Sequence, residues 1–69
     1  MKLSARNLLP GTVVKVTNGA VNAEVVLKLD GGTEITSVVT LGALTELGLK
    51  PGTKAYAVVK ASNVILAVD

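Results

Sequence analysis

Short runs of aliphatic residues, separated by turn-forming residues, make up most of this chain. Residues 21–29 carry an apolar side chain at every odd position, and residues 12–17 and 54–60 are rich in valine. Alternation with a period of two and a high content of β-branched residues are typical of β-strands. The pattern predicts strands over residues 12–17, 21–29, 33–40, 54–60 and 64–68, with residues 3–8 as a first strand or an extended arm.

Four turn signals separate these runs. Asn18-Gly19 is typical of a type I′ turn, in which both central residues need positive φ, and therefore predicts a hairpin. Pro10-Gly11 is predicted to break the chain between residues 3–8 and the next strand. Asp30-Gly31-Gly32 and Lys50-Pro51-Gly52-Thr53 predict two further turns.

Residues 41–48 follow a different pattern, with a leucine at every third position from residue 41 to residue 47. This spacing predicts a helix of one or two turns, for which Thr40 is a suitable N-cap and Gly48 a suitable end. Five strands and one short helix late in the chain predict an all-β fold, a five-stranded OB-like Greek-key barrel. Adjacent apolar residues such as Val25-Val26-Leu27 indicate that a neighbouring subunit covers the outer face of some strands.

The composition limits how such a small barrel is stabilised. The chain has 69 residues, 49% of them hydrophobic, with no cysteine and no histidine. We expect a single domain over residues 1–69. A domain of this size buries only ~60% of the surface that its unfolded chain exposes, and disulfides, a metal or oligomerisation usually supply the missing stability. Disulfides are excluded and the usual zinc ligands are absent, so we expect a homo-oligomer.

The chain shows no signal for a membrane or for export. No apolar run approaches the ~20 residues of a membrane-spanning helix. The N-terminus lacks the apolar stretch and cleavage site of a signal peptide, so we expect a cytoplasmic protein with no membrane partner. The formal net charge of +2 suits a small anion and gives only weak support for nucleic acid.

The inventory of side chains argues against catalysis. There is no histidine or cysteine for acid–base or nucleophilic chemistry, and the acidic residues are scattered along the chain. We therefore expect no enzyme activity, no cofactor and no directly ligated metal ion. An OB-type nucleic-acid-binding module is a weaker alternative, because such modules stack bases on aromatic side chains and Tyr56 is the only aromatic residue.

The remaining polar residues suit a tetrahedral oxyanion, which offers only hydrogen-bond acceptors. Arg6, the only arginine, supplies a planar fork of donors, and Lys60 supplies a compact cation. The hydroxyls of Ser4 and Ser62 can each donate one hydrogen bond. Further donors are the backbone N–H groups around Ala5, Ala61 and Ser62, and those of Thr40 and Ala43 where the helix begins.

A plainer interpretation of the same residues stands beside this one. Ser4 and Asn7 are common in turns and caps, and a lone arginine near an N-terminus is most often surface charge. Residues 60–63 also suit a polar turn between two strands, with the Lys60 ammonium in solvent. These short motifs alone leave the choice between a binding site and a solvated surface open.

Several longer motifs occur along the chain in an order and spacing that are shared by one protein family. They are Ser4-Ala5-Arg6-Asn7, Asn18-Gly19-Ala20-Val21-Asn22-Ala23-Glu24-Val25, Ile35-Thr36-Ser37-Val38-Val39-Thr40, Leu47-Gly48-Leu49-Lys50-Pro51-Gly52 and Lys60-Ala61-Ser62-Asn63-Val64. Together they cover essentially the whole chain and resemble the molbindins (Mop, or molybdenum-pterin-binding proteins) and their TOBE/Mop domain. Ala43 stands where the molybdate-responsive regulator has a serine, which leaves only a backbone contact there.

The resemblance implies an OB-like barrel whose N-terminal strand is exchanged between two subunits, with three such dimers in a hexamer. It implies that molybdate or tungstate binds at subunit interfaces. The implied site takes Ser4, Arg6 and the backbone around Ala5 and Asn7 from one subunit, is completed by Lys60, Ala61 and Ser62, and has Thr40 and Ala43 nearby. A second oxyanion site, near the threefold axis, is expected at Asn18, Gly19, Ala20 and Val21.

The function that this resemblance implies is storage or homeostasis of molybdenum in the cytoplasm, without turnover of the bound oxyanion. The alternative within the same family is a regulatory accessory domain that senses the oxyanion and acts on a partner protein.

Overall fold

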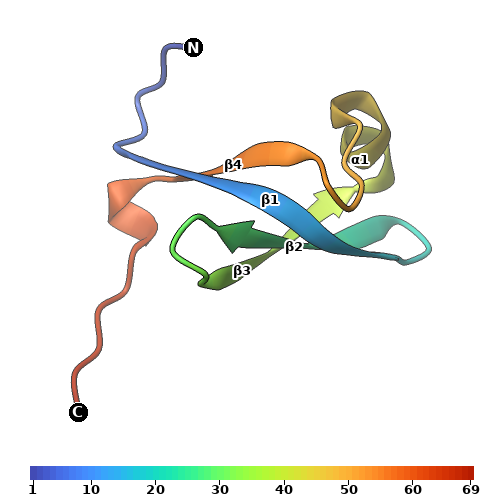
Figure 1. Cartoon of the computed structure of the whole chain (residues 1–69). Coiled ribbons are helices and arrows are strands. Elements are labelled where there is room, and N and C mark those ends of the chain that lie inside the picture. Colours follow the sequence, from blue (N-terminus) through green and yellow to red (C-terminus); the bar gives the residue numbers. More distant parts are fainter.

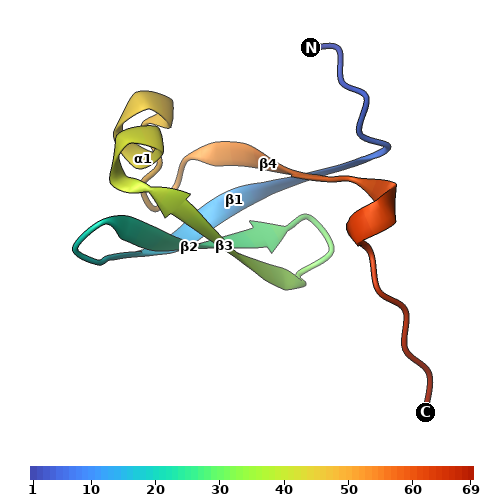
Figure 2. The ribbon, with the colours of Figure 1, turned by 180° about the vertical axis from the view of Figure 1, so that it is seen from behind.

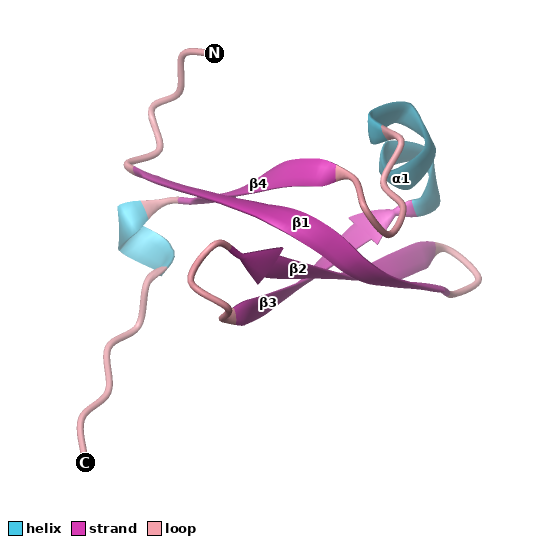
Figure 3. Cartoon of the chain, in the orientation of Figure 1, coloured by secondary structure: helices cyan, strands magenta, loops and turns pink.

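The computed structural model describes residues 1–69 as a curled antiparallel sheet with one short helix (Figures 1 and 3). The elements are β1 (Asn7–Asn18), β2 (Asn22–Leu29), β3 (Glu34–Thr40), α1 (Leu41–Leu47), β4 (Lys54–Val59) and the short 3-10 helix η1 (Ala61–Asn63). The strands lie in the order β3-β2-β1-β4, and each neighbouring pair is antiparallel. The predicted all-β architecture with a single short α-helix is therefore confirmed.

The long strand β1 connects the two halves of the sheet, because its first part pairs with β4 and its second part with β2. The chain break predicted at Pro10-Gly11 is wrong, since β1 runs through both residues. Pro10 lies opposite Tyr56 of β4, one residue before pairing with β2 begins at Gly11, so it is on a stretch with a single neighbouring strand. Gly11 is buried, and a Cβ there would lie 2.5 Å from the Lys28 carbonyl oxygen, so glycine allows β1 and β2 to approach closely.

The predicted hairpin joins β1 to β2, but the predicted type I′ turn is wrong. Neither Asn18 nor Gly19 has positive φ. Asn18 lies opposite Ala23, so the connection is longer than two residues, and the Gly19 N–H closes it by donating to the Asn22 carbonyl at 2.8 Å. A loop of this length needs no left-handed residue at these positions.

The helix α1 begins and ends at the predicted residues and lies at one end of the sheet (Figure 2). The Thr40 hydroxyl oxygen accepts a hydrogen bond from the Ala43 N–H at 3.0 Å, and Gly48 ends the helix in the left-handed region at φ 64°. The turns predicted at residues 30–32 and 50–53 are also present, and their glycines Gly32 and Gly52 have φ values of 97° and 96°. None of the helices reaches the length and apolarity that crossing a membrane requires.

The core of the chain is small and lies on the concave face of the sheet. The buried apolar residues are Val13, Ala23, Val25 and Leu27, so the apolar odd positions within β2 face the core. Val21, at the start of that pattern, is 72% exposed because it lies in the connection before β2. Much of the aliphatic surface therefore has no partner within a single chain.

Both ends of the chain lie outside the sheet. The predicted fifth strand at residues 64–68 does not form in this chain, because η1 turns the backbone away from the open strand edges (Figure 1). Residues 1–6 leave the sheet in the opposite direction, and β1 itself pairs with β2 and β4 of its own chain. Five strands and an exchanged N-terminal strand are thus not confirmed.

Candidate anion-binding site

The pairing of β1 with β4 brings the two ends of the candidate site together. Asn7 lies opposite Val59, and the Asn7 side-chain amide donates to the Val59 carbonyl at 3.2 Å. Arg6 precedes this pair and Lys60 follows it, so the two cations are attached to neighbouring strands at the same end of the sheet (Figure 1). A separation of more than fifty residues in the sequence is thus reduced to one strand spacing, ~4.8 Å, at this pair.

The donors at this end are accessible and not engaged within the chain. Ser4, Arg6, Lys60 and Ser62 are exposed. The side-chain hydrogen bonds of the structure involve Asn7, the threonines at positions 40, 45 and 53, and backbone groups, and none of the four exposed donors takes part. Their hydroxyl, guanidinium and ammonium hydrogens therefore remain free to bind an anion.

The helix η1 adds backbone donors to the same cluster. Within it the Asn63 N–H donates to the Lys60 carbonyl at 2.9 Å and the Val64 N–H to the Ala61 carbonyl at 3.3 Å. The N–H groups of Ala61 and Ser62 come before these bonds, at the start of the turn, where helical geometry gives them no partner inside the turn. Ala61 has a side chain too small to shield them from an ion.

Thr40 and Ala43 do not join this cluster in a single chain. They lie where β3 ends and α1 begins, at the end of the sheet opposite η1 (Figure 1). The predicted Ala43 N–H donor is already used, because it donates to the Thr40 hydroxyl oxygen. The Thr40 hydroxyl keeps its own hydrogen, which it can still donate.

The residues of the second predicted site are grouped at that same far end. Asn18, Gly19, Ala20 and Val21 are all exposed. The Leu41 N–H donates to the Val21 carbonyl at 3.1 Å, which places this connection against the beginning of α1. The structure thus forms two separate groups of predicted site residues, one at each end of the sheet.

The chemistry of the η1 end favours an anion over a cation. No group of three or more His, Cys, Asp or Glu side chains is close enough together to hold a metal ion. The η1 end carries two fixed-charge cations and two hydroxyls, a donor set that fits a tetrahedral oxyanion and would repel a bare metal ion.

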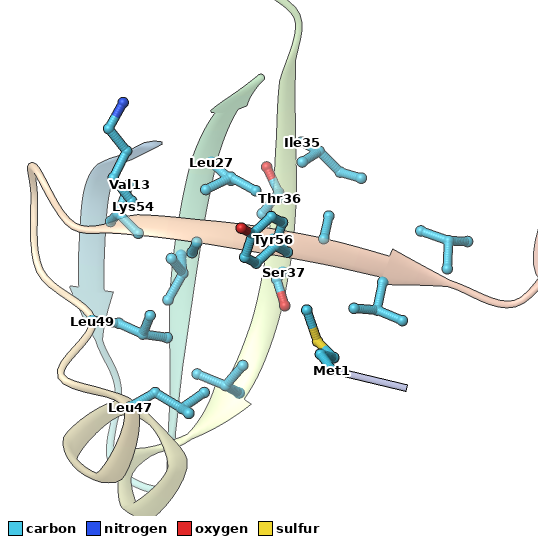
Figure 4. A pocket seen from close by; sticks show the side chains of 16 residues that line it. Met1, Val13, Leu27, Ile35, Thr36, Ser37, Leu47, Leu49, Lys54 and Tyr56 are labelled. Carbon is cyan, nitrogen blue, oxygen red and sulfur yellow. The ribbon is translucent and has the colours of Figure 1, made fainter. Parts of the chain in front are cut away.

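Sequence reasoning missed a cavity of about 560 Å³ on the concave side of the sheet. It lies between β3 and β4, and 13 of its 16 lining residues are hydrophobic. Figure 4 labels Ile35, Thr36 and Ser37 of β3 and Tyr56 of β4 among the residues that line it. The available signal was the surplus of aliphatic residues over what a small core can hold, but that surplus does not indicate where the surface lies.

Comparison with known proteins shows which family this chain resembles in sequence and fold. The TOBE domain family matches residues 3–66. A probable molybdenum-pterin-binding protein from Haemophilus influenzae is 48% identical over 69 residues and is covered completely, as is this chain. The solved structure of MopII from Clostridium pasteurianum is 46% identical with a TM-score of 0.90, covering 97% of this chain and 100% of its own.

A second solved structure extends over every residue of this chain. It is the molybdate-bound form of the cytoplasmic molybdate-binding protein ModG, which is 67% identical with a TM-score of 0.96 and covers 100% of this chain and 49% of its own. Fold and comparisons together define a small all-β domain of the Mop type. The chain belongs to the TOBE domain family, as the sequence motifs predicted, and its full-length relatives include molybdenum-pterin-binding (Mop) proteins.

Proposed function

We propose that this protein binds molybdate or tungstate reversibly, without turnover, and serves storage or homeostasis of molybdenum in the cytoplasm. The observation that carries the proposal is the β1–β4 pairing, which places Arg6 and Lys60 directly beyond the same end pair, Asn7 and Val59. The similarity to ModG, whose structure holds molybdate, supports the choice of oxyanion. The oxyanion is the ligand here, and no cofactor is part of the proposal.

The proposed site lies between subunits. One subunit contributes Ser4 and Arg6 with the backbone around Ala5 and Asn7, and Lys60, Ala61 and Ser62 complete the shell. Thr40 and Ala43 reach this shell from a further subunit, because a single chain holds them at the opposite end of the sheet. Desolvation between subunits strengthens each charge-assisted hydrogen bond, and binding only to the assembled state stabilises the oligomer.

The proposed assembly is a homohexamer, a trimer of dimers. In it the whole chain, residues 1–69, acts as one unit, the barrel gains its fifth strand, and a terminal segment is exchanged between subunits. At the N-terminus, residues 1–6 are the part that the sheet leaves free for such an exchange. The exposed connection formed by Asn18, Gly19, Ala20 and Val21 is the proposed second oxyanion site near the threefold axis.

A regulatory accessory domain is the second candidate function. It is favoured by the fact that a domain of this fold forms about half of the longer ModG chain, so the unit also occurs inside larger proteins. Nucleic-acid binding has less support, because the single aromatic side chain, Tyr56, lines the apolar cavity and forms no stacking platform with a second ring.

Isothermal titration of the folded, oligomeric protein with molybdate, tungstate and sulfate tests the proposal. We expect saturable binding of the first two with dissociation constants of about 1 μM or lower, equivalent to roughly −8 kcal/mol, and mutual competition. Sulfate serves as the matched control, because it has the same charge and shape class but a smaller radius. Absence of heat with both molybdate and tungstate in an oligomeric sample would contradict the proposed function.

A further inference from the structure

Asn18 differs from the other asparagines of the chain in the residue that follows it. At positions 7, 18, 22 and 63, asparagine is followed by leucine, glycine, alanine and valine. A side chain on the following residue crowds its backbone nitrogen, whereas glycine has no Cβ and leaves that nitrogen open. Asparagine is a thermolabile residue, because its side-chain carbonyl carbon can be attacked by the next backbone nitrogen. Asn18-Gly19 is therefore the asparagine position most open to this covalent change.

The surroundings of Asn18 leave its side chain free to react. Asn18 is exposed, is the last residue of β1 and makes no side-chain hydrogen bond. Asn7, by contrast, is held by its bond to the Val59 carbonyl oxygen. Asn22 is also exposed and free of side-chain hydrogen bonds, but it begins β2 and precedes the buried Ala23. Asn18 and Asn22 thus share their exposure and differ in the residue that follows.

The connection between β1 and β2 favours glycine at the reactive position. A Cβ on Gly19 would lie 2.9 Å from the Asn22 carbonyl oxygen, closer than real Cβ atoms come to other atoms. The Gly19 N–H donates to the same oxygen at 2.8 Å. This hydrogen bond fixes the nitrogen while the connection is closed, so the attack on Asn18 requires local opening, which exposed connections undergo most easily. The contact that favours glycine here therefore also limits its reaction.

We propose that Asn18 is a site of spontaneous deamidation, and that the hydrogen bond from the Gly19 N–H to the Asn22 carbonyl controls the rate. The Gly19 nitrogen attacks Cγ of Asn18 and forms an N–Cγ bond. The Cγ–Nδ2 bond breaks, and ammonia leaves with the hydrogen that the Gly19 nitrogen carried. Water then adds across either C–N bond of the cyclic imide. The Gly19 nitrogen regains a hydrogen, and residue 18 becomes aspartate or isoaspartate.

The reaction changes the charge and the backbone of the connection while the sheet stays in place. Either product carries a carboxylate where the amide stood, and isoaspartate also lengthens the main chain. Asn18 pairs with Ala23 at the last position of the β1–β2 ladder, so the change falls at the end of the sheet. The Leu41 N–H donates to the Val21 carbonyl at 3.1 Å, so the altered connection lies against the beginning of α1 (Figure 1).

The consequence for anion binding rests on the proposed function, in which residues 18–21 form the second oxyanion site. A carboxylate at residue 18 repels a dianion in this position, because like charges at short range are unfavourable. The cluster at Arg6 and Lys60 lies at the opposite end of the sheet and keeps its donors. Deamidation therefore removes one class of site, and the anion capacity of a molecule falls with its age.

Peptide mapping by mass spectrometry, after incubation in mildly alkaline buffer, tests the modification without any anion. Trypsin releases residues 16–28 as one peptide, so Asn22 serves as the internal control for Asn18. We expect the mass change from NH₂ to OH at Asn18 and little change at Asn22. In urea the hydrogen bond of Gly19 is lost, and conversion should be about 5-fold faster or more, the effect of one hydrogen bond of ordinary strength. Asn18→Ser should abolish the acidic form.

Three results would overturn the proposal. Equal conversion of Asn18 and Asn22 would show that Gly19 does not direct the reaction. Equal rates for Asn18 in folded protein and in urea would show that the Gly19 hydrogen bond does not control it. An unchanged Asn18 in the folded protein, under conditions in which the urea-treated protein is converted, would show that the connection does not open.

Calorimetric titration of Asn18→Asp with molybdate tests the consequence for binding. We expect fewer molybdate ions bound per chain than in the wild type. Lys15→Ala lowers the net charge by the same amount and should keep the wild-type stoichiometry. Equal stoichiometry in all three proteins would contradict the link between deamidation and anion binding. Conversion at Asn18 together with a failed titration of the wild type would leave the modification standing and reject only the proposed function.

Discussion

The Asn7 side-chain amide donates to the Val59 carbonyl oxygen at 3.2 Å and so joins two residues that are fifty-two positions apart in the chain. This bond lies at the last residue pair between β1 and β4, immediately before Arg6 and Lys60 leave the sheet. It holds together the two strand ends from which the candidate site extends.

Replacing Asn7 with alanine should therefore affect both stability and binding. Loss of one partly buried hydrogen bond is expected to lower the free energy of unfolding by about 1 kcal/mol. The molybdate dissociation constant should rise as well, because the strand ends separate more easily. Urea unfolding at fixed protein concentration and calorimetry measure the two effects. Asn22→Ala, at an exposed asparagine with no side-chain hydrogen bond, is the control and should change neither.

Gly11 is the only glycine within a strand, and it should be difficult to replace. A Cβ at this position would lie 2.5 Å from the Lys28 carbonyl oxygen, which belongs to backbone that is fixed by pairing. Gly11→Ala should cost about 1–3 kcal/mol through forced strand separation. Gly31→Ala is the matched control, because nothing lies within 4 Å of its Cβ position. Equal thermal midpoints for the two variants would show that β1 and β2 do not approach as closely as described.

These positions also show which features were predictable from sequence. The α1 caps and the inward positions of β2 follow from local rules, so Thr40, Gly48 and the alternation of Val25 and Leu27 were enough to place them. The continuous path through Pro10 depends on which neighbours β1 has, a non-local property that a turn signal does not contain.

The candidate site divides in the same way. Its donors could be selected by residue type, since Arg6 is the only arginine and Lys60 is followed by Ala61 and Ser62. That Arg6 and Lys60 lie near each other depends on the pairing of β1 with β4. That Thr40 lies far from these two residues depends on the length of β1. The fifth strand could not form in one chain, because η1 directs residues 64–68 away from the only free edges.

Thr40 should have a structural role that can be separated from any role in binding. Thr40→Val removes the oxygen that caps the Ala43 N–H and should destabilise the protein by about 1 kcal/mol. Thr40→Ser keeps the oxygen and should restore stability in thermal unfolding. If the Thr40 hydroxyl also donates to the anion, Thr40→Val weakens molybdate binding and Thr40→Ser restores it. Unchanged binding in Thr40→Val would remove Thr40 from the site.

Arg6 gives the most direct test of the anion site. Its guanidinium is exposed and makes no hydrogen bond within the chain, so Arg6→Ala should leave the circular dichroism spectrum unchanged. A charge-assisted hydrogen bond contributes about 1.5–3 kcal/mol, so the molybdate dissociation constant should rise ~10- to 100-fold. Arg6→Lys keeps the charge but loses the planar fork, and its affinity should fall between those of wild type and Arg6→Ala.

The control for net charge is Lys15→Ala. This variant removes one exposed cation from the second half of β1, away from the strand ends at Asn7 and Val59. Its molybdate affinity should match that of the wild type, because a solvent-exposed charge beyond the Debye length of ~8 Å is screened at physiological ionic strength. Equal loss of affinity in Lys15→Ala and Arg6→Ala would point to a general electrostatic effect. Wild-type affinity in Arg6→Ala would show instead that molybdate binds elsewhere, and the connection at Asn18 and Gly19 would then be the next region to test.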